Sequence, residues 1–290
     1  MQKFSSEKLP YYTIFCCCLA VYALFSYLCR IKSLLLMKTK PFVFSLIASA
    51  LMLGSCGSHY QVSNVSRTRL LVDNRYEATP DARAASIVAP FKQVVDSAMS
   101  PVVGTTARYM APDRPEDLLS NLLPDVLMWG AAKYNEHPDF AVYNIGGIRA
   151  AFAKGKVTYG DVIDVAPFEN KICFLTLTGE KVLELFQQIA VRGGEGLSHG
   201  VQLTITKDWK FVDVTLNGEP IDKTRNYRLA TLDYLSQGND GMGAFRSGTD
   251  LVSPQDENNN VRYIIIDYFR DKMSRGEEVD AQLEGRVVVR

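Results

Sequence analysis

The chain has 290 residues, 47% of them hydrophobic, and its 32 basic residues are balanced by 32 acidic ones. This length and apolar content are sufficient for one or two domains with a substantial core. A formal net charge of zero argues against the basic surface typical of nucleic-acid binding, and there is no acidic tail that would indicate a disordered segment.

The N-terminal region has the pattern of a targeting segment. Hydrophobic stretches occupy residues 11–28 and 41–53. The second follows a short segment with Lys38 and Lys40 and ends in Gly54, Ser55 and Cys56, an order that resembles a bacterial lipoprotein signal. Cys56 is then the lipidated residue and the mature N-terminus. An uncleaved membrane anchor is the alternative. Residues 11–28 are nearly long enough to span a bilayer, so two membrane spans remain possible.

We therefore expect residues 1–36 to be a misassigned upstream extension or an extra hydrophobic segment, with Met37 as the start. Residues 37–55 are the predicted signal peptide, residues 56–80 a tether and residues 81–290 a folded domain. Such a protein is a membrane-anchored lipoprotein that faces the periplasm or the cell surface. Of the six cysteines only Cys173 falls in the folded part, where a buried thiol is expected rather than a disulfide framework.

The first half of the folded part predicts helices and strands in alternation. Residues 81–99 form a predicted helix with apolar or small residues at helical spacing. Residues 115–132 form a second, in which Pro124 should produce a kink or a restart. Residues 141–143, 156–159, 161–165 and 172–177 are strand-like. Thr178 is the predicted N-cap of a helix over 179–190, which Gly193 and Gly194 end.

The second half is richer in strands. Residues 201–206 alternate, residues 210–216 are their expected antiparallel partner, and Asn217-Gly218 predicts a hairpin leading into 219–222. Residues 227–232 are a strand that ends in a glycine-rich loop, and residues 261–271 are a helix. This mixture predicts a single α+β domain.

Three loops that follow strands carry the candidate functional residues, because loops at strand ends commonly hold function. The first places Asn144, Gly146, Gly147 and Arg149 in one turn. Glycine tolerates positive φ and lets a ligand approach the backbone. Asn144 and Arg149 could therefore converge on a polar, anionic small molecule; an ordinary turn with an exposed arginine is the alternative.

The other two loops contribute aromatic rings and a carboxylate. Phe168 and Tyr234 lie on different loops and either pack into the core or clamp a planar ring, as aromatic side chains do with bases. Asp240 is either a turn residue or an acceptor for two vicinal hydroxyls. An arginine that binds an anion, two aromatic rings that stack on a planar ring and an aspartate that binds a diol together indicate a nucleotide or nucleoside ligand.

These segments resemble the C-terminal, substrate-binding domain of the 5′-nucleotidase family, which includes the bacterial UDP-sugar hydrolases. The matching pieces are Asn-x-Gly-Gly-Ile-Arg at 144–149, Gly-Lys-Val-Thr-Tyr-Gly-Asp at 155–161, Pro-Phe at 167–168, the strand end at 175–179, the hairpin at 217–218 and residues 227–241. The resemblance covers about residues 85–275 in order. It implies a four-layer α-β-β-α sandwich.

The resemblance also implies a role for each site residue. Phe168 and Tyr234 would sandwich the base, and Asp240 would hold the ribose hydroxyls. Asn144 would reach the base or ribose edge, and Arg149 would serve the phosphate.

The chain departs from the family pattern in four places. Tyr234 replaces a phenylalanine, which preserves stacking. Asn239 replaces a glycine and would strain its turn unless it adopts the left-handed conformation. Pro115 occupies the position before Glu116 where the family has a second arginine, so Arg114 is the nearest match, and Pro124 replaces a helix former.

Catalytic and metal-binding residues are not expected in this chain. Its three histidines, His59, His137 and His199, lack the sequence contexts of metal ligands. The family resemblance implies a metallophosphatase domain whose two metals activate water. We expect those divalent metals, the only cofactors implied, on a partner protein. The chain would then be the nucleotide-binding half of a split 5′-nucleotidase. A stand-alone nucleoside- or nucleotide-binding lipoprotein and a degenerate interaction domain are the alternatives.

Overall fold

The computed structural model describes Ser66, Ala78 and residues 81–290. Ala78 and residues 81–290 belong to one compact unit, Asn74–Arg290. The expected upstream extension, signal peptide and lipidated Cys56 lie outside the described residues. In the described part, no helix is both long and apolar enough to cross a membrane.

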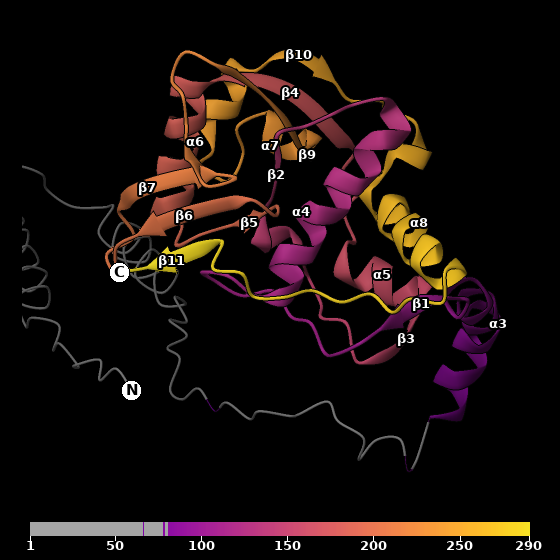
Figure 1. Cartoon of the computed structure of the whole chain (residues 1–290). Helices are drawn as coiled ribbons and strands as arrows, with labels where there is room; N and C mark the ends of the chain where they lie inside the picture. Colours follow the sequence, from indigo (N-terminus) through magenta and orange to yellow (C-terminus); the bar gives the residue numbers. More distant parts are fainter. Residues whose placement is uncertain (1–65, 67–77, 79–80) are drawn as a thin grey trace, which may run out of the picture. The chain divides into compact units, whose positions relative to one another are not determined.

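The described strands form three sheets (Figure 1). Two sheets are mixed. In one, β2 (Phe140–Tyr143) pairs with β9 (Asn226–Leu232) in parallel, in the other β11 (Val287–Val289) pairs with β6 (Val201–Ile205) in parallel, and their other pairs are antiparallel. The strands of the five-stranded sheet are, in order, β10 (Thr249–Val252), β4 (Ile172–Thr178), β9 (Asn226–Leu232), β2 (Phe140–Tyr143) and β5 (Gly196–Leu197). Those of the four-stranded sheet are β11 (Val287–Val289), β6 (Val201–Ile205), β7 (Phe211–Leu216) and β8 (Glu219–Pro220), and β1 (Val102–Thr106) pairs with β3 (Gly155–Thr158).

Helices cover these sheets and complete an α+β domain, as predicted. Helix α4 (Leu118–Gly130) packs on β2, β5 and β9 and against α8 (Val261–Ser274). Helix α6 (Gly179–Val191) contacts strands of both larger sheets, β4 and β9 in one and β6 and β7 in the other. The remaining short helices are α5 (Tyr159–Val165), α7 (Asp233–Ser236), η3 (Ala131–Tyr134), η4 (Ile145–Gly147), η5 (Gly243–Ser247) and η6 (Glu257–Asn259).

Helix α6 shows how local sequence and packing agree. The Thr178 side chain accepts a hydrogen bond from the backbone N–H of Lys181 and caps the helix, as predicted. The apolar stripe of α6 is buried, and Phe186 stacks on Phe140 with 5.4 Å between ring centroids. Each such side chain contributes about 1.5–3 kcal/mol to folding. Cys173 is a free, buried thiol on β4, and burial raises its pKa to about 11.

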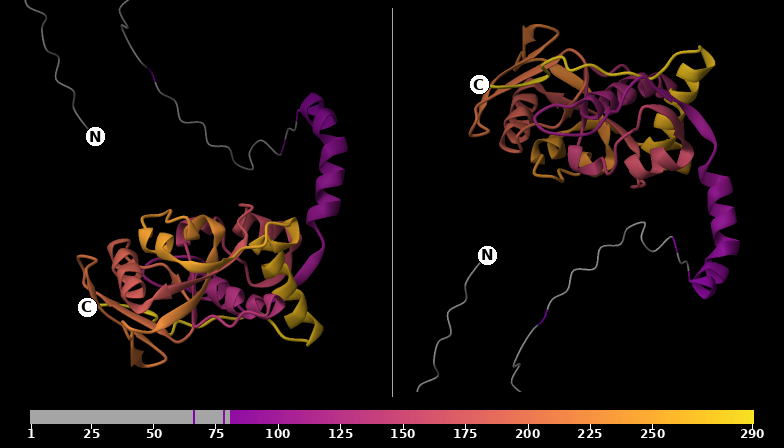
Figure 2. Two further views of the ribbon diagram at one scale, coloured as in Figure 1. Left: turned by 90° about the horizontal axis from the view of Figure 1, so that it is seen from above. Right: turned by 90° about the horizontal axis from the view of Figure 1, so that it is seen from below.

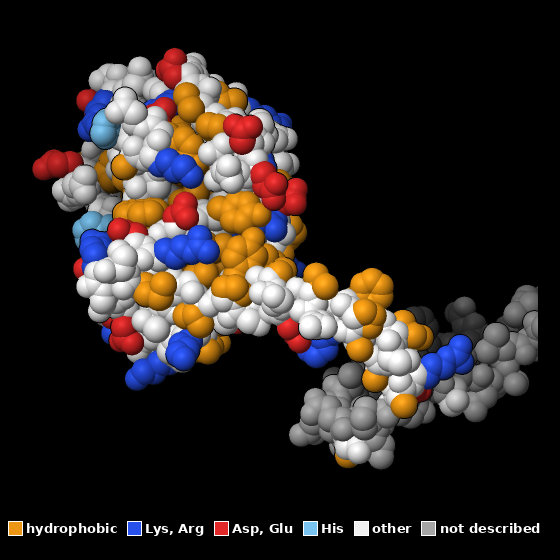
Figure 3. Space-filling model, turned by 90° about the vertical axis from the view of Figure 1, so that its right-hand side faces the viewer, with side chains coloured by type: hydrophobic (Ala, Val, Ile, Leu, Met, Phe, Trp, Pro, Cys, Tyr) orange, Lys and Arg blue, Asp and Glu red, His pale blue; other side chains and the backbone are white. Residues whose placement is uncertain are grey.

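Helix α3 (Ala82–Met99) forms where it was predicted, capped by Asp81, but its apolar stripe is not buried. Such a stripe ordinarily faces a core. Here Ile87 is 60% exposed, Phe91 71% and Val94 70%, and no residue of the helix is buried. The helix extends away from the sheets, and hydrophobic side chains line it (Figures 2 and 3).

The structure around residues 161–165 and at Pro124 differs from simple sequence patterns. The strand-like residues 161–165 are helical in α5, so that prediction was wrong. The reason is a capping box, in which Thr158 Oγ1 accepts from the Asp161 N–H and the Asp161 carboxylate accepts from the Thr158 N–H. Pro124 lies inside α4, which continues through it to Gly130 without a restart.

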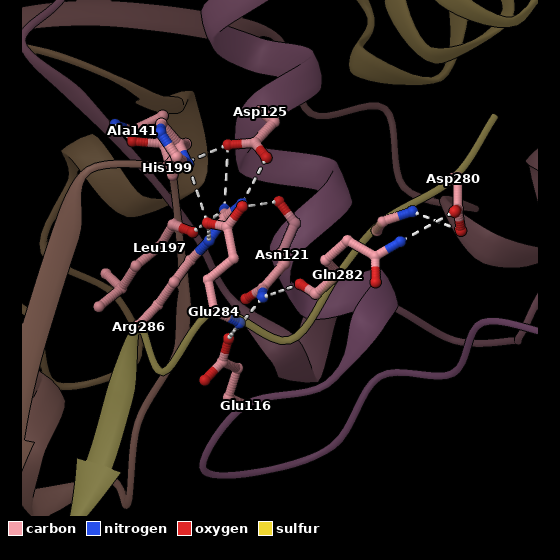
Figure 4. A network of polar contacts seen from close by, with 12 residues as sticks. Glu116, Asn121, Asp125, Ala141, Leu197, His199, Asp280, Gln282, Glu284 and Arg286 are labelled. Carbon is pink, nitrogen blue, oxygen red and sulfur yellow. Dashed lines mark hydrogen bonds and ion pairs between the residues drawn. The ribbon is translucent and has the colours of Figure 1, made fainter.

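The C-terminal segment is held on α4 by a buried arginine (Figure 4). Arg286 is 3% exposed and binds both carboxylate oxygens of Asp125, at 3.0 and 2.7 Å. It also donates to the carbonyl of Leu197 over 2.7 Å. Glu284 bonds both Arg286 and His199; burial raises the pKa of this carboxyl, but these two bonds outweigh burial and leave it below its usual value.

Candidate functional site

The three predicted loops meet around one cavity of about 240 Å³. Six of the eight predicted site residues line it, and two further residues join them. The lining residues are Asn144, Gly146, Gly147, Phe168, Asn170, Arg192, Tyr234 and Asp240.

The glycine turn is built around the side chain of Asn144. Asn144 precedes the 3₁₀ turn η4, and its carbonyl accepts from the Gly147 N–H over 2.9 Å. A Cβ at Gly147 would lie 2.7 Å from Asn144 Oδ1, so a side chain at this position would displace the asparagine. A Cβ at Gly146 would meet nothing within 4 Å. Gly147 therefore accommodates Asn144, whereas the space beside Gly146 is open.

Asn144, Asp240 and Tyr234 form a hydrogen-bonded set at the cavity. Asn144 Nδ2 donates to Asp240 Oδ2 over 2.8 Å, and the Tyr234 hydroxyl donates to Asp240 Oδ1 over 3.1 Å. The hydrogen bond to Asp240 raises the pKa of Tyr234, because it favours the protonated phenol. Asn144 Oδ1 is buried without a hydrogen-bond partner. This acceptor can be satisfied by a ligand that donates a hydrogen bond.

The loop that carries Asp240 has the left-handed conformation at Asp240 itself. Its φ is 54°, with Gly238 at 78° and Gly241 at 75°. Asn239 does not have a positive φ, so the expected strain does not arise at that residue. Instead the Asn239 side chain donates to the Tyr234 carbonyl over 2.7 Å and holds the loop.

The two aromatic rings face the cavity rather than the core. Phe168 is 49% exposed and Tyr234 37% exposed. Phe168 therefore does not pack into the core, and that alternative prediction was wrong. Two rings on separate loops beside one cavity have the arrangement that a planar ligand needs for stacking.

Neither of the two predicted site arginines, Arg149 and Arg114, lines the cavity. Arg149 is exposed and donates to the carbonyl of Gly146 over 3.2 Å. Arg114 donates to the Gly194 carbonyl over 3.0 Å and pairs with Glu195 over 2.6 Å.

Sequence reasoning missed Arg192 and Glu195 and assigned no role to Asn170. Arg192, the C-cap of α6, lines the cavity, and its Nη2 lies 3.8 Å from Asp240 Oδ2. Asn170 lies in the loop already singled out by Phe168. Glu195 is buried and accepts from the Ile145 N–H over 2.6 Å. The position of Arg192 before the Gly193-Gly194 helix stop was the one available signal.

The histidines of the described part do not form a metal site. His137 and His199 are exposed, and His199 Nδ1 lies 2.9 Å from Glu284 Oε2. Across Ser66, Ala78 and residues 81–290, no group of three or more His, Cys, Asp or Glu side chains could hold a metal ion.

Comparison with known proteins identifies relatives of this domain. The sequence model described as 5′-nucleotidase, C-terminal domain, matches residues 102–247, just over half of the chain. The chain is 27% identical to protein UshA of Escherichia coli over 168 residues, which are 57% of this chain and 30% of UshA. It is also 27% identical to cell wall protein Lmo0130 of Listeria monocytogenes over 240 residues, 74% of this chain and 30% of that protein.

Solved structures agree with these matches. The 5′-nucleotidase precursor of Thermus thermophilus superposes with a TM-score of 0.62 at 25% identity, over 73% of this chain and 44% of that one. The NAD nucleotidase of Haemophilus influenzae, at 19% identity and a TM-score of 0.54, has the same fold. The chain thus spans about 30% of the length of the curated relatives above. It belongs to the 5′-nucleotidase family and carries the C-terminal domain of that family.

Proposed function

We propose that this domain binds a nucleoside, or the nucleoside part of a nucleotide, between Phe168 and Tyr234. The observation that carries the proposal is a single cavity with two half-exposed rings, the acceptor Asn144 Oδ1 and the carboxylate of Asp240. Base–aromatic stacking contributes about 1–3 kcal/mol per base. Asp240 then accepts from the ribose hydroxyls, and Asn144 accepts from a donor on the base or ribose.

The split-enzyme hypothesis extends this proposal to turnover. The chain would supply the nucleotide-binding half of a 5′-nucleotidase, and a separately encoded metallophosphatase would hold the divalent metals. Two observations support it: residues 102–247 match the C-terminal domain of the 5′-nucleotidase family, and six of the eight predicted site residues of that domain line one cavity. The exposed apolar stripe of α3 is a surface on which that partner would dock.

Lipidation at Cys56 would place this domain at a membrane facing an extracytoplasmic space, where nucleotides are salvaged. This follows from the signal-like pattern around residues 37–56, outside the described residues. Metabolic labelling with a fatty acid tests it, with Cys56→Ala as the control. Label retained by Cys56→Ala contradicts anchoring at this residue.

A stand-alone nucleoside-binding protein is the second candidate, and the placement of the arginines favours it. Arg114 is paired with Glu195, and Arg149 is bonded to a backbone carbonyl. A phosphate would have to compete with these partners. This candidate predicts that adenosine binds at least as tightly as AMP and that no partner is needed.

Calorimetry on the full-length protein in detergent tests the ligand. Adenosine, AMP and UDP-glucose are titrated into the wild type, Phe168→Ala and Tyr234→Ala. Tyr109→Ala removes an aromatic ring that is 62% exposed but does not line the cavity, and it serves as the matched control. Loss of more than about 1 kcal/mol in both cavity variants, about fivefold in Kd, supports the clamp. Equal binding by all four proteins contradicts it.

Phosphate release from AMP tests the split enzyme. A purified candidate metallophosphatase is assayed alone, with this chain, and with the variant Phe91→Asp, which places a charge on the α3 stripe. Gln93→Asp, on the polar face of α3, is the matched control. Activation by the wild type and by Gln93→Asp, but not by Phe91→Asp, supports docking through α3. No gain over the phosphatase alone contradicts the partnership with that phosphatase.

A further inference from the structure

Four charged side chains alternate in sign in a series that ends at the cavity. Arg114 Nη2 lies 2.6 Å from Glu195 Oε1, and the same oxygen accepts from Arg192 Nε. Arg192 Nη2 in turn lies 3.8 Å from Asp240 Oδ2. Two positive and two negative groups give a net charge of zero. Only the last two, Arg192 and Asp240, line the cavity.

Glu195 is the member of this series that is held most firmly in place by burial and hydrogen bonds. Its side chain is fully buried, and its second oxygen accepts from the Ile145 N–H over 2.6 Å. A buried carboxylate is tolerated when it is paired and hydrogen-bonded, and losing one partner is strongly unfavourable. Glu195 therefore ties the end of α6 to the glycine turn and orients the guanidinium of Arg192 toward Asp240.

The cavity thus presents a donor beside an acceptor. The side chain of Arg192 is 30% exposed and that of Asp240 22%, so both are within reach of a ligand. Arginine only donates hydrogen bonds and an ionised aspartate only accepts them, whereas a hydroxyl does both. A phosphate would be repelled by Asp240 and an ammonium group by Arg192. A pair of neighbouring hydroxyls satisfies both, donating to Asp240 and accepting from Arg192.

We propose that Arg192, acting together with Asp240, determines specificity for the vicinal diol of ribose against 2′-deoxyribose, with Glu195 as the positioning residue. This inference rests on the proposed nucleoside site. A site built to bond a hydroxyl rejects the analogue that lacks it, because its polar groups are then left unpaired. Since Arg192 and Asp240 are partly exposed, water replaces some of the lost bonding, and we expect a preference of about tenfold or more for ribose.

The test compares adenosine with 2′-deoxyadenosine by calorimetry on the full chain. The variants are Arg192→Met, which keeps length but removes the donors, Arg192→Lys, which keeps the charge, and Glu195→Gln, which weakens the positioning bonds. Arg225→Met, an arginine 55% exposed and outside the cavity lining, is the matched control. Thermal melting shows that each variant is folded.

The wild type and Arg225→Met should prefer adenosine by about tenfold or more, and Arg192→Met should reduce that ratio below about threefold by weakening adenosine alone. Arg192→Lys and Glu195→Gln should give intermediate ratios. Phe168→Ala should weaken both nucleosides equally and keep the ratio. An unchanged ratio in Arg192→Met and Arg192→Lys, with adenosine still bound, overturns the role of Arg192 and leaves the nucleoside site intact. Absence of adenosine binding by the wild type overturns both.

Discussion

The hydroxyl of Tyr234 donates a hydrogen bond to Asp240 over 3.1 Å, so the tyrosine contributes more to the cavity than a ring face. Asp240 also accepts from Asn144 over 2.8 Å. Both carboxylate oxygens are thus engaged before any ligand arrives, and a ribose would exchange bonds rather than find a free acceptor.

Tyr234→Phe separates these two contributions. The phenylalanine keeps the stacking surface and frees Asp240 Oδ1, and a net hydrogen bond contributes about 0.5–1.5 kcal/mol. We expect adenosine to bind Tyr234→Phe at least as tightly as the wild type, while Tyr234→Ala loses about 1 kcal/mol or more. Calorimetry on both variants measures this. Equal losses in the two variants would show that the hydroxyl itself contacts the ligand.

The same bond predicts a dependence of stability on pH. The pKa of Tyr234 is raised above 10.0, first by its hydrogen bond to Asp240. A raised folded-state pKa gives stability that is present below the unfolded pKa and is lost as pH rises through the folded one. The melting temperature of the wild type should therefore exceed that of Tyr234→Phe by a constant difference near neutral pH. This difference should become smaller above about pH 10. Melting temperatures measured from pH 7 upward check this; a constant margin contradicts it.

The two glycines of the turn predict opposite outcomes. Gly147→Ala places a Cβ 2.7 Å from Asn144 Oδ1 and must displace a buried side chain. We expect a loss of about 1–3 kcal/mol in the free energy of unfolding, together with weaker adenosine binding. Gly146→Ala, with nothing within 4 Å, should stay within about 0.5 kcal/mol of the wild type. Urea denaturation compares the two, and similar stability losses would contradict this account.

The exposure of α3 predicts that its aromatic ring adds little to the stability of the chain. Phe91 is 71% exposed, so Phe91→Ala should change the free energy of unfolding by less than about 0.5 kcal/mol. Phe186→Ala, at 1% exposure in α6, should cost about 3–5 kcal/mol. Denaturant titrations measure both. A loss above about 1 kcal/mol in Phe91→Ala would mean that the stripe is covered in the free protein.

The attachment of the C-terminal segment depends on an ion pair between Asp125 and the buried Arg286. Asp125→Ala leaves Arg286, only 3% exposed, without its bidentate partner. The Asp125 side chain is 33% exposed and Arg286 keeps its ion pair with Glu284, so we expect a loss of about 1–3 kcal/mol, less than for a fully buried pair. Lys92→Ala breaks a pair whose side chains are 66% and 54% exposed and should cost less than about 1 kcal/mol. Thermal unfolding tests the difference, and equal shifts would contradict a structural role for Asp125.

Local sequence patterns predicted most elements of the domain. The Thr178 cap, the apolar stripe of α6 and the Asn217-Gly218 hairpin all appear where they were expected. These features form between residues close in sequence, so side-chain period and turn chemistry suffice to predict them. Helix α5 was missed although its capping box, Thr158 and Asp161, is also formed by residues close in sequence.

The sequence by itself determined the family, the order of the three loops and six of the eight residues around the cavity. Only the tertiary structure decided which arginine faces that cavity. Arg114 pairs with Glu195, 81 positions away, and Arg192 takes the cavity position instead. Likewise Asn144 meets Asp240 across 96 positions. Such pairings depend on how strands and loops that are distant in the sequence pack together. The local preference of each segment for helix, strand or turn carries no information about that packing.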